Sequence, residues 1–171
     1  MKIEIMGYSG SGKSTLCREL SKIYNVPALH MDTVQFLPNW KERDDEEKQK
    51  MVRFFLDCNP NGWVIDGNYT KLSYERRVDE ADIIIQLLFG RINCLCRCVK
   101  RFLSYKGKSR PDMTEGCEEK IDWEFINWIL WEGRSKTARD RYRRIQNQYP
   151  DKVIVIRNQR QLNGYLKKVS F

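Results

Sequence analysis

The stretch that decides the fold of this chain is Gly7-Tyr8-Ser9-Gly10-Ser11-Gly12-Lys13-Ser14. It matches the complete pattern G-x-x-x-x-G-K-[ST] of a phosphate-binding loop. The apolar run at residues 2–6 predicts a strand before the loop, and residues 14–24 predict a helix after it. In this order, the glycines let backbone N–H groups surround phosphate oxygens at the positive end of a helix. The alternative is a chance Gly/Ser turn, and the two flanking elements count against it.

The loop residues have separate expected roles in binding ATP and Mg²⁺. Lys13 is expected to reach the β- and γ-phosphates, which also makes it a catalytic candidate. The hydroxyl of Ser14 is expected to bind Mg²⁺. The predicted nucleotide-binding residues are Gly7, Ser9, Gly10, Ser11, Gly12, Lys13, Ser14 and Thr15.

The composition indicates a single globular domain over residues 1–171, with 41% hydrophobic and 32% charged residues. No apolar run approaches the roughly 20 residues that span a membrane. Because the first strand begins at the N-terminus, we expect no signal peptide, a cytoplasmic protein and six reduced cysteines. The net charge of +8 favours anionic partners, from nucleotides to nucleic acids.

Three cysteines recur at every second position, Cys94, Cys96 and Cys98. Alternate residues of a helix point in different directions, so these three are not expected to share a metal ion. Small side chains packed in or near the core are the favoured interpretation. The single histidine, His30, adds little to metal chemistry in this sequence.

Five apolar runs are candidates for strands, at residues 2–6, 27–31, 63–65, 82–88 and 153–156. They are continuous rather than alternating, which is typical of parallel strands covered on both faces. Helical patterns lie between and after them, at residues 14–24, 44–58, 91–104, 119–131, 134–148 and 159–169. This alternation predicts a three-layer α/β fold with right-handed crossovers. The segment 105–118, which is rich in Gly, Pro and charge, is expected to be mobile.

Two carboxylates follow predicted strands. Asp32 comes after the second strand and Asp66 after the third. Since ligands bind at the carboxyl ends of the strands in open α/β sheets, both side chains are expected near Lys13. We expect Asp32 to act as a general base or to bind a substrate hydroxyl, and Asp66 to lie on the metal side with Ser14. The alternative is that either residue caps the helix or turn that follows it.

Arginines form a second group of candidates. Arg97 and Arg101 are spaced i,i+4 on one predicted helix and share a face, while Arg139 and Arg143 belong to a later basic helix. Forked guanidinium groups stabilise the spread charge of phosphoryl transfer, so Arg97, Arg101 and Arg139 or Arg143 are catalytic candidates. The alternative is that they lie on solvated helix faces. Arg110 in the Gly/Pro segment is a candidate for substrate binding.

Aromatic residues accompany these charges. Trp40, soon after Asp32, is expected either to stack on a ring in the acceptor site or to anchor its loop. Phe125 and Trp128 fall at helical spacing and are expected to pack on the core, whereas Trp123 and Trp131 have no such assignment. Basic residues mixed with aromatic residues are also typical of surfaces that bind single-stranded nucleic acid by stacking.

Several segments together resemble the bacterial FlaR-related DNA topology modulation proteins, a subgroup of P-loop proteins similar to adenylate kinase and other nucleotide kinases. These segments are residues 7–14, 30–32, 36–40, 63–69 and 109–117. The resemblance implies a nucleoside-monophosphate-kinase-like P-loop fold whose parallel sheet has five strands in the order 2-3-1-4-5. It also implies an acceptor region after the second strand, a short lid at about 105–118, and phosphate-binding arginines on the helices before and after the lid.

This chain departs from the adenylate kinase pattern after the third strand. Adenylate kinases have Asp-Gly-Phe-Pro-Arg at this place, whereas this chain has Asp66-Gly67-Asn68-Tyr69. The AMP site therefore does not carry over, and the acceptor need not be a nucleotide. The candidates for binding the acceptor are Asp32, Trp40, Asp66, Tyr69 and Arg110.

The favoured function is a kinase, a transferase that passes the γ-phosphoryl group of ATP to a small molecule or nucleotide with Mg²⁺. One alternative is a nucleic-acid-associated ATPase or regulator that affects DNA topology, which the basic charge supports. Another is a nucleotide sensor with little turnover. Nucleic acid is the less favoured partner, no membrane is expected, and the oligomeric state is not predicted.

Overall fold

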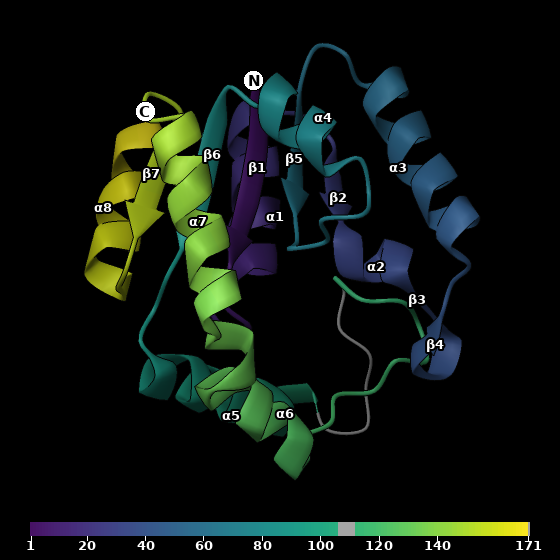
Figure 1. The fold of residues 1–171 in the computed structure, drawn as a ribbon, viewed down its shortest axis with the longest axis vertical. Coiled ribbons are helices and arrows are strands. Elements are labelled where there is room, and N and C mark those ends of the chain that lie inside the picture. The colour runs from purple at the N-terminus through teal and green to yellow at the C-terminus, as the bar shows by residue number, and fades with distance from the viewer. Residues whose placement is uncertain (106–111, 171) are drawn as a thin grey trace.

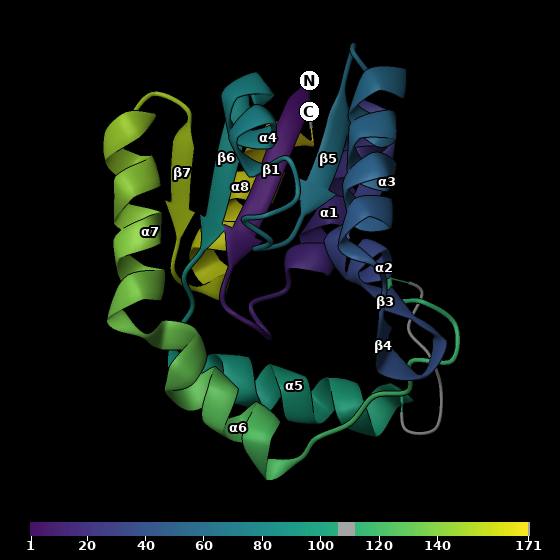
Figure 2. The ribbon, with the colours of Figure 1, turned by 45° about the vertical axis from the view of Figure 1, so that its right-hand side comes forward.

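The computed structural model describes residues 1–105 and 112–170. Within this part of the chain, a parallel sheet of five strands lies between helices (Figures 1 and 2). In spatial order the strands are β2 (Ala28–His30), β5 (Trp63–Asp66), β1 (Lys2–Gly7), β6 (Ile83–Leu87) and β7 (Val153–Ile156). Counted along the chain, this sheet has the order 2-3-1-4-5, which confirms the predicted α/β P-loop fold.

The two faces of the sheet contribute to two hydrophobic clusters. One cluster includes residues of α1 (Lys13–Tyr24), α5 (Arg91–Tyr105) and α8 (Gln159–Val169). The other includes residues of α3 (Asp45–Cys58), α4 (Tyr74–Glu80) and α7 (Lys136–Gln148). Parallel strands covered in this way bury side chains on both faces, which explains why their sequences are continuously apolar.

The strands run toward α5 and α6 (Trp123–Leu130), which lie across the carboxyl end of the sheet (Figure 2). The ends of β1, β2 and β5 are therefore on the side of the molecule that carries α5 and α6. Among the described residues, no helix combines the length and apolar character that crossing a membrane requires.

Two predicted helices begin later than expected because capping side chains define their first turns. Asp122 accepts a hydrogen bond from the Phe125 backbone N–H at 2.7 Å, so the helix predicted over 119–131 is Trp123–Leu130. The short turn η2 (Glu132–Arg134) follows it. Ser135 then caps the helix predicted over 134–148, which begins at Lys136.

Short elements without a clear hydrophobic period escaped prediction. These are α2 (Met31–Gln35), the hairpin of β3 (Phe36–Leu37) and β4 (Lys41–Glu42), the turn η1 (Pro38–Trp40) between them, and α4. Helix α4 has a charged sequence, and one of its two buried residues is Arg77. Its inward face therefore carries no run of apolar residues that a periodicity could detect.

The predicted lid segment 105–118 is described only in part. Residues 106–111, which include Arg110, lie outside the described residues. In the described part, the Thr114 hydroxyl donates to the carbonyl oxygen of Phe36 at 2.6 Å, and the Cys117 thiol donates to that of Leu37 at 3.2 Å. Residues 114–117 are thus joined to the hairpin strand β3.

Candidate active site

Glycines with a left-handed backbone conformation shape the phosphate-binding loop. Gly10 has a φ of +75° and Gly12 a φ of +95°, which residues with a side chain rarely adopt. A Cβ at Gly10 would lie 2.6 Å from both the carbonyl oxygen of Cys94 and the Sγ of Cys98. Helix α5 therefore packs directly against the loop, and a larger residue at position 10 would push it away.

Asn68 holds the start of the loop from the segment after β5. The backbone N–H of Gly7 donates to Asn68 Oδ1 at 3.1 Å, and Asn68 Nδ2 donates to the carbonyl oxygen of Gly7 at 2.7 Å. These two hydrogen bonds join the nucleotide loop to the segment that carries Asp66 and Tyr69. No sequence pattern pointed to this role for Asn68, although it lies two residues after Asp66.

The polar groups of the loop fit a phosphate. Lys13 Nζ donates to the carbonyl oxygens of Gly7 at 3.2 Å and Tyr8 at 3.3 Å, so the ammonium group lies over the loop. The buried hydroxyl of Ser11 has no hydrogen-bond partner among the described residues. Of these two groups, the Lys13 side chain belongs to a residue that lines the cavity, and its ammonium group suits an anionic ligand that supplies acceptor oxygens.

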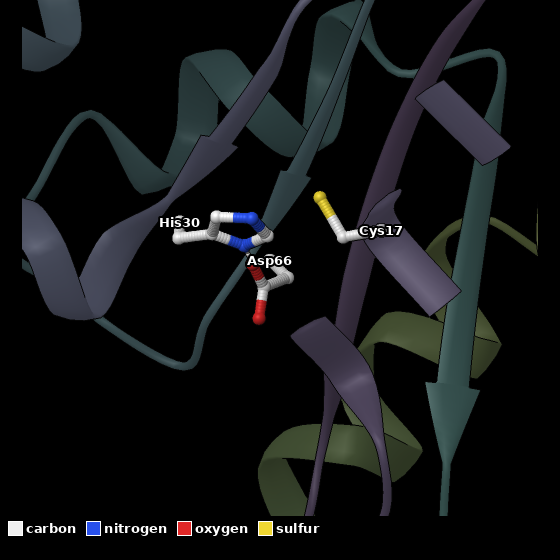
Figure 3. Close-up of side chains that lie close together, drawn as sticks. All are labelled: Cys17, His30 and Asp66. Carbon is white, nitrogen blue, oxygen red and sulfur yellow. Dashed lines mark hydrogen bonds and ion pairs between the residues drawn. The ribbon is translucent and has the colours of Figure 1, made fainter. Parts of the chain in front are cut away.

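Ser14 and Asp66 lie together, as expected for a metal-binding pair. The Ser14 hydroxyl donates to Asp66 Oδ2 at 2.9 Å, and His30 Nδ1 lies 2.5 Å from Asp66 Oδ1 (Figure 3). Asp66 ends β5 and His30 is its partner in the register of β2, which explains their contact. Burial lowers the pKa of His30, but the hydrogen bond and charge of Asp66 outweigh it, so the net shift is upward. Oxygen donors of this kind suit Mg²⁺.

Asp32 lies in the first turn of α2, where its carboxylate binds Tyr69. The Tyr69 hydroxyl donates to Asp32 Oδ1 at 2.7 Å. Burial and the neighbouring Asp32 carboxylate raise the pKa of Tyr69 above its usual value, so the hydroxyl remains a proton donor. The N-cap residue of α2 is His30. Asp32 therefore does not cap this helix, which was the alternative role expected for it.

Trp40 anchors its own loop and also lines the cavity of the site. Its indole N–H donates to the carbonyl oxygen of Glu118 at 2.9 Å, and its ring meets Phe36 edge-on with 5.3 Å between centroids. Trp40 has a φ of +62°, a conformation that is strained for a bulky residue. The surrounding contacts hold it there, and Trp40 lines a cavity that extends to the phosphate-binding loop.

One cavity of about 1080 Å³ joins the phosphate-binding loop to the strand-end carboxylates. Its volume is ample for a nucleotide and a small second substrate. Gly7 and Ser11 are not among its lining residues. The predicted site residues that line it are Ser9, Gly10, Gly12, Lys13, Ser14, Thr15, Asp32, Trp40, Asp66, Tyr69, Arg97 and Arg101.

The two arginines of α5 reach this cavity as their spacing predicted. Arg97 Nη1 donates to the carbonyl oxygen of Ser11 at 2.8 Å, and its guanidinium lies 4.5 Å from the centre of the Phe89 ring. Arg101 Nε donates to Glu119 Oε2 at 3.1 Å. Arg97 is therefore held against the phosphate-binding loop itself, while Arg101 is paired with a carboxylate.

On α7 the structure brings a different arginine to the cavity. Arg139 is exposed, and Arg143, whose side chain is 76% exposed, lies 3.9 Å from Asp140, so neither lines the cavity. Arg141 does line it, and its Nη1 donates to the carbonyl oxygen of Asn68 at 3.2 Å. The inward face of α7 is set by the buried residues Ala138, Tyr142 and Ile145. That spacing was the signal that could have selected Arg141.

Trp128 differs from expectation, whereas Phe125 does not. Phe125 packs against the core as predicted, but Trp128 is 47% exposed and its indole N–H donates to the Ser9 hydroxyl at 3.2 Å. Trp128 thus covers the phosphate-binding loop instead of filling the core. Trp123 and Trp131 are 75% and 53% exposed.

Comparisons with known proteins agree with this fold. The structure resembles an uncharacterized protein from Eubacterium ventriosum ATCC 27560, with a TM-score of 0.53, 16% identity, and 99% of this chain and 98% of that chain covered. It also resembles a gluconokinase from Sinorhizobium meliloti 1021, with a TM-score of 0.50, 13% identity, and coverage of 98% and 88%. No curated protein matches the sequence. Residues 3–101, more than half of the chain, match the family model AAA_18, described as an AAA domain. The chain is thus a P-loop protein of kinase-like fold that belongs to this AAA domain family.

Proposed function

We propose that this protein is a Mg²⁺-dependent kinase that transfers the γ-phosphoryl group of ATP to a hydroxyl or phosphate oxygen of a small molecule or nucleotide. The observation that carries the proposal is the shared cavity, which Lys13 and Ser14 of the phosphate-binding loop line together with Asp32 and Tyr69. A protein that only binds a nucleotide needs only the phosphate-binding loop. A phosphotransferase also needs a place for the acceptor next to it, with a group that can take a proton.

The loop end of the cavity would hold the nucleotide. Backbone N–H groups of the loop and the ammonium group of Lys13 would bind the phosphates, and Arg97 lies against the same loop. Ser14 and Asp66 are the residues that would hold Mg²⁺. When bound, that ion neutralises charge on the phosphates during transfer.

The acceptor end of the cavity is the region of Asp32, Tyr69 and Trp40. Tyr69 donates to Oδ1 of Asp32 and thereby orients the carboxylate. The other oxygen, Oδ2, would take the proton of the acceptor hydroxyl as the new P–O bond forms and the bond to the leaving ADP breaks. Phe36 and Trp40 give this end an aromatic wall.

Arg97 and Arg141 are the arginines best placed to stabilise the transferring group. Their hydrogen-bond partners among the described residues are backbone carbonyl oxygens and, for Arg97, the amide oxygen of Gln159. Because these partners are neutral, the positive charge of the two side chains is available to an anion. Forked donors of this kind match the oxygens of a phosphoryl group.

Coupled ADP release tests the proposal directly. The protein is supplied with Mg-ATP and a panel of nucleosides, nucleoside monophosphates and small hydroxylated metabolites. A kinase shows strong stimulation by one class of acceptor and a phosphorylated product in equal amount to the ADP released. ATP turnover that no acceptor on a broad panel changes would contradict the assignment.

A nucleic-acid-associated ATPase or regulator of DNA topology is a second candidate. The observations that favour it are the net charge of +8 and the exposure of Trp123 and Trp131, since exposed aromatics among basic residues can stack on unpaired bases. Single-stranded and duplex DNA belong on the same panel for this reason. Under this candidate DNA raises the ATPase rate, its affinity falls steeply with salt, and alanine at Trp123 and Trp131 weakens binding.

A further inference from the structure

A thiol, an imidazole and a carboxylate meet beside the phosphate-binding loop. Cys17 comes from α1, His30 from the end of β2 and Asp66 from the end of β5 (Figure 3). One ligand atom from each of the three side chains lies within 4.8 Å of the other two. The three residues are far apart in the sequence, and the pairing of β2 with β5 beside α1 brings them together.

The cluster is largely shielded from water. Cys17 is fully buried and Asp66 is 4% exposed, while His30 is half-buried. Figure 3 shows the Cys17 sulfur on the side of the imidazole ring that carries its second nitrogen, away from the nitrogen that contacts Asp66. A sulfur, a nitrogen and an oxygen donor still lie within 4.8 Å of one another, so they border one small region.

We propose that Cys17, His30 and Asp66 bind one divalent ion of the zinc class, with the fourth coordination position open. Zinc takes thiolate sulfur at about 2.3 Å and imidazole nitrogen or carboxylate oxygen at about 2.0–2.2 Å, so donors this close need only small side-chain shifts. Cysteine and histidine donors select zinc, cobalt or copper over Mg²⁺, which prefers oxygen donors only.

This site is separate from the Mg²⁺ site of the proposed function, although Asp66 contributes to both. Oδ2 of Asp66 faces Ser14 and Oδ1 faces His30, so the carboxylate offers one oxygen to each side. Binding of the ion displaces the thiol proton of Cys17 to solvent. His30 binds the ion through one ring nitrogen and keeps a proton on the other, and Oδ1 of Asp66 exchanges its contact with His30 for a bond to the ion. Because Asp66 lines the cavity, the ion can enter from there.

Cobalt(II) chloride is the probe for this site, because Co²⁺ replaces zinc and its bond to a thiolate absorbs in the near ultraviolet. The protein used is a Cys58→Ser, Cys96→Ser background, which removes the two exposed cysteines. We expect one Co²⁺ per chain with a thiolate absorption band. Added Zn²⁺ should abolish the band, and excess Mg²⁺ should leave it unchanged.

Two variants and one matched control decide the assignment. Cys17→Ala should remove the band, and His30→Asn should weaken Co²⁺ binding at least about tenfold while keeping an amide donor near Asp66. Cys98→Ala makes the same change at another buried cysteine and should keep the band. Absence of the band in the background protein, its persistence in Cys17→Ala, or its loss on adding Mg²⁺ would each overturn the proposal. These readouts need no catalytic turnover, so they stand apart from the kinase assay.

Discussion

The hydroxyl of Tyr69 donates to the carboxylate of Asp32 across 2.7 Å, which joins the segment after β5 to helix α2. Tyr69 is in turn held by Arg77, whose guanidinium donates to the Tyr69 carbonyl oxygen at 2.7 Å and to that of Leu72 at 3.0 Å. The orientation of Asp32 therefore depends on a buried arginine that does not line the cavity.

The first prediction concerns the two partners of this hydrogen bond. Asp32→Asn should lower kcat by about 10²- to 10⁴-fold, because an amide cannot take the proton of the acceptor. Tyr69→Phe leaves the carboxylate in place but free to rotate, so a loss of about tenfold is expected. Neither change should alter the affinity for ATP, measured by calorimetry with the acceptor absent. An equal loss of ATP binding and transfer in Asp32→Asn would argue against its role as base.

The second prediction tests the phosphate-binding loop. Lys13→Ala removes the ammonium group that lies over the loop and should lower ATP turnover at least about 10²- to 10³-fold. The fold should survive, because the hydrogen-bond partners of Lys13 Nζ are two backbone carbonyl oxygens at the start of the same loop, those of Gly7 and Tyr8. Lys22→Ala, at an exposed position of the same helix, is the matched control and should keep full turnover. Unchanged turnover in Lys13→Ala would remove the basis for nucleotide binding at this loop.

The third prediction separates two arginines of one helix. Arg141 lines the cavity, whereas Arg143 is 76% exposed and lies near Asp140. Arg141→Gln should lower kcat/KM by roughly tenfold to a hundredfold, because a forked donor to the phosphoryl group is lost. Arg143→Gln makes the same change in charge and should have little effect on steady-state kinetics. If both variants lose activity equally, the loss comes from the lower net charge of the protein and not from the position of Arg141 in the cavity, which would contradict the prediction.

The sheet was predictable because each buried parallel strand is a continuous apolar run that ends in turn residues. Asp66 was placed near Ser14 for the same reason, since the carboxyl ends of parallel strands meet at one edge. The hydrogen bond from Tyr69 to Asp32 was not predictable, because it depends on how the segment after β5 folds back toward α2. The choice of Arg141 over Arg139 and Arg143 required the rotational phase of α7, which its buried residues determine.

The cluster of Cys17, His30 and Asp66 was missed for a similar reason. A single histidine and isolated cysteines show no metal-binding spacing in the sequence, and the three side chains meet only through the register of β2 with β5. The partner of Glu4 could not be predicted from the sequence either, because a carboxylate in the middle of an apolar strand does not indicate which cation it will contact. The structure pairs it with Arg77, which comes from α4.

The last prediction concerns this buried pair. Glu4 and Arg77 are both 0% exposed, and Arg77 Nη1 donates to Glu4 Oε1 at 2.5 Å. Desolvation raises the pKa of Glu4 from 4.5 to about 7, against the opposing effect of Arg77. Between these two values the folded protein binds a proton that the unfolded chain has released. This contribution to stability is therefore complete below pH 4.5 and is lost as the pH rises through about 7.

Urea unfolding of the wild type and of Glu4→Gln measures this contribution, because glutamine does not titrate. Between pH 4.5 and a pH above 7, the free energy of unfolding of the wild type should fall by about 3 kcal/mol more than that of the variant. Glu4→Gln removes the anionic partner that Arg77 has only once Glu4 ionises, so the difference in pH dependence, and not the stability at one pH, is the quantity to compare. Parallel pH profiles would show that Glu4 has the same pKa in the folded and unfolded states. The ion pair with Arg77 would then fully offset the cost of burying the carboxylate.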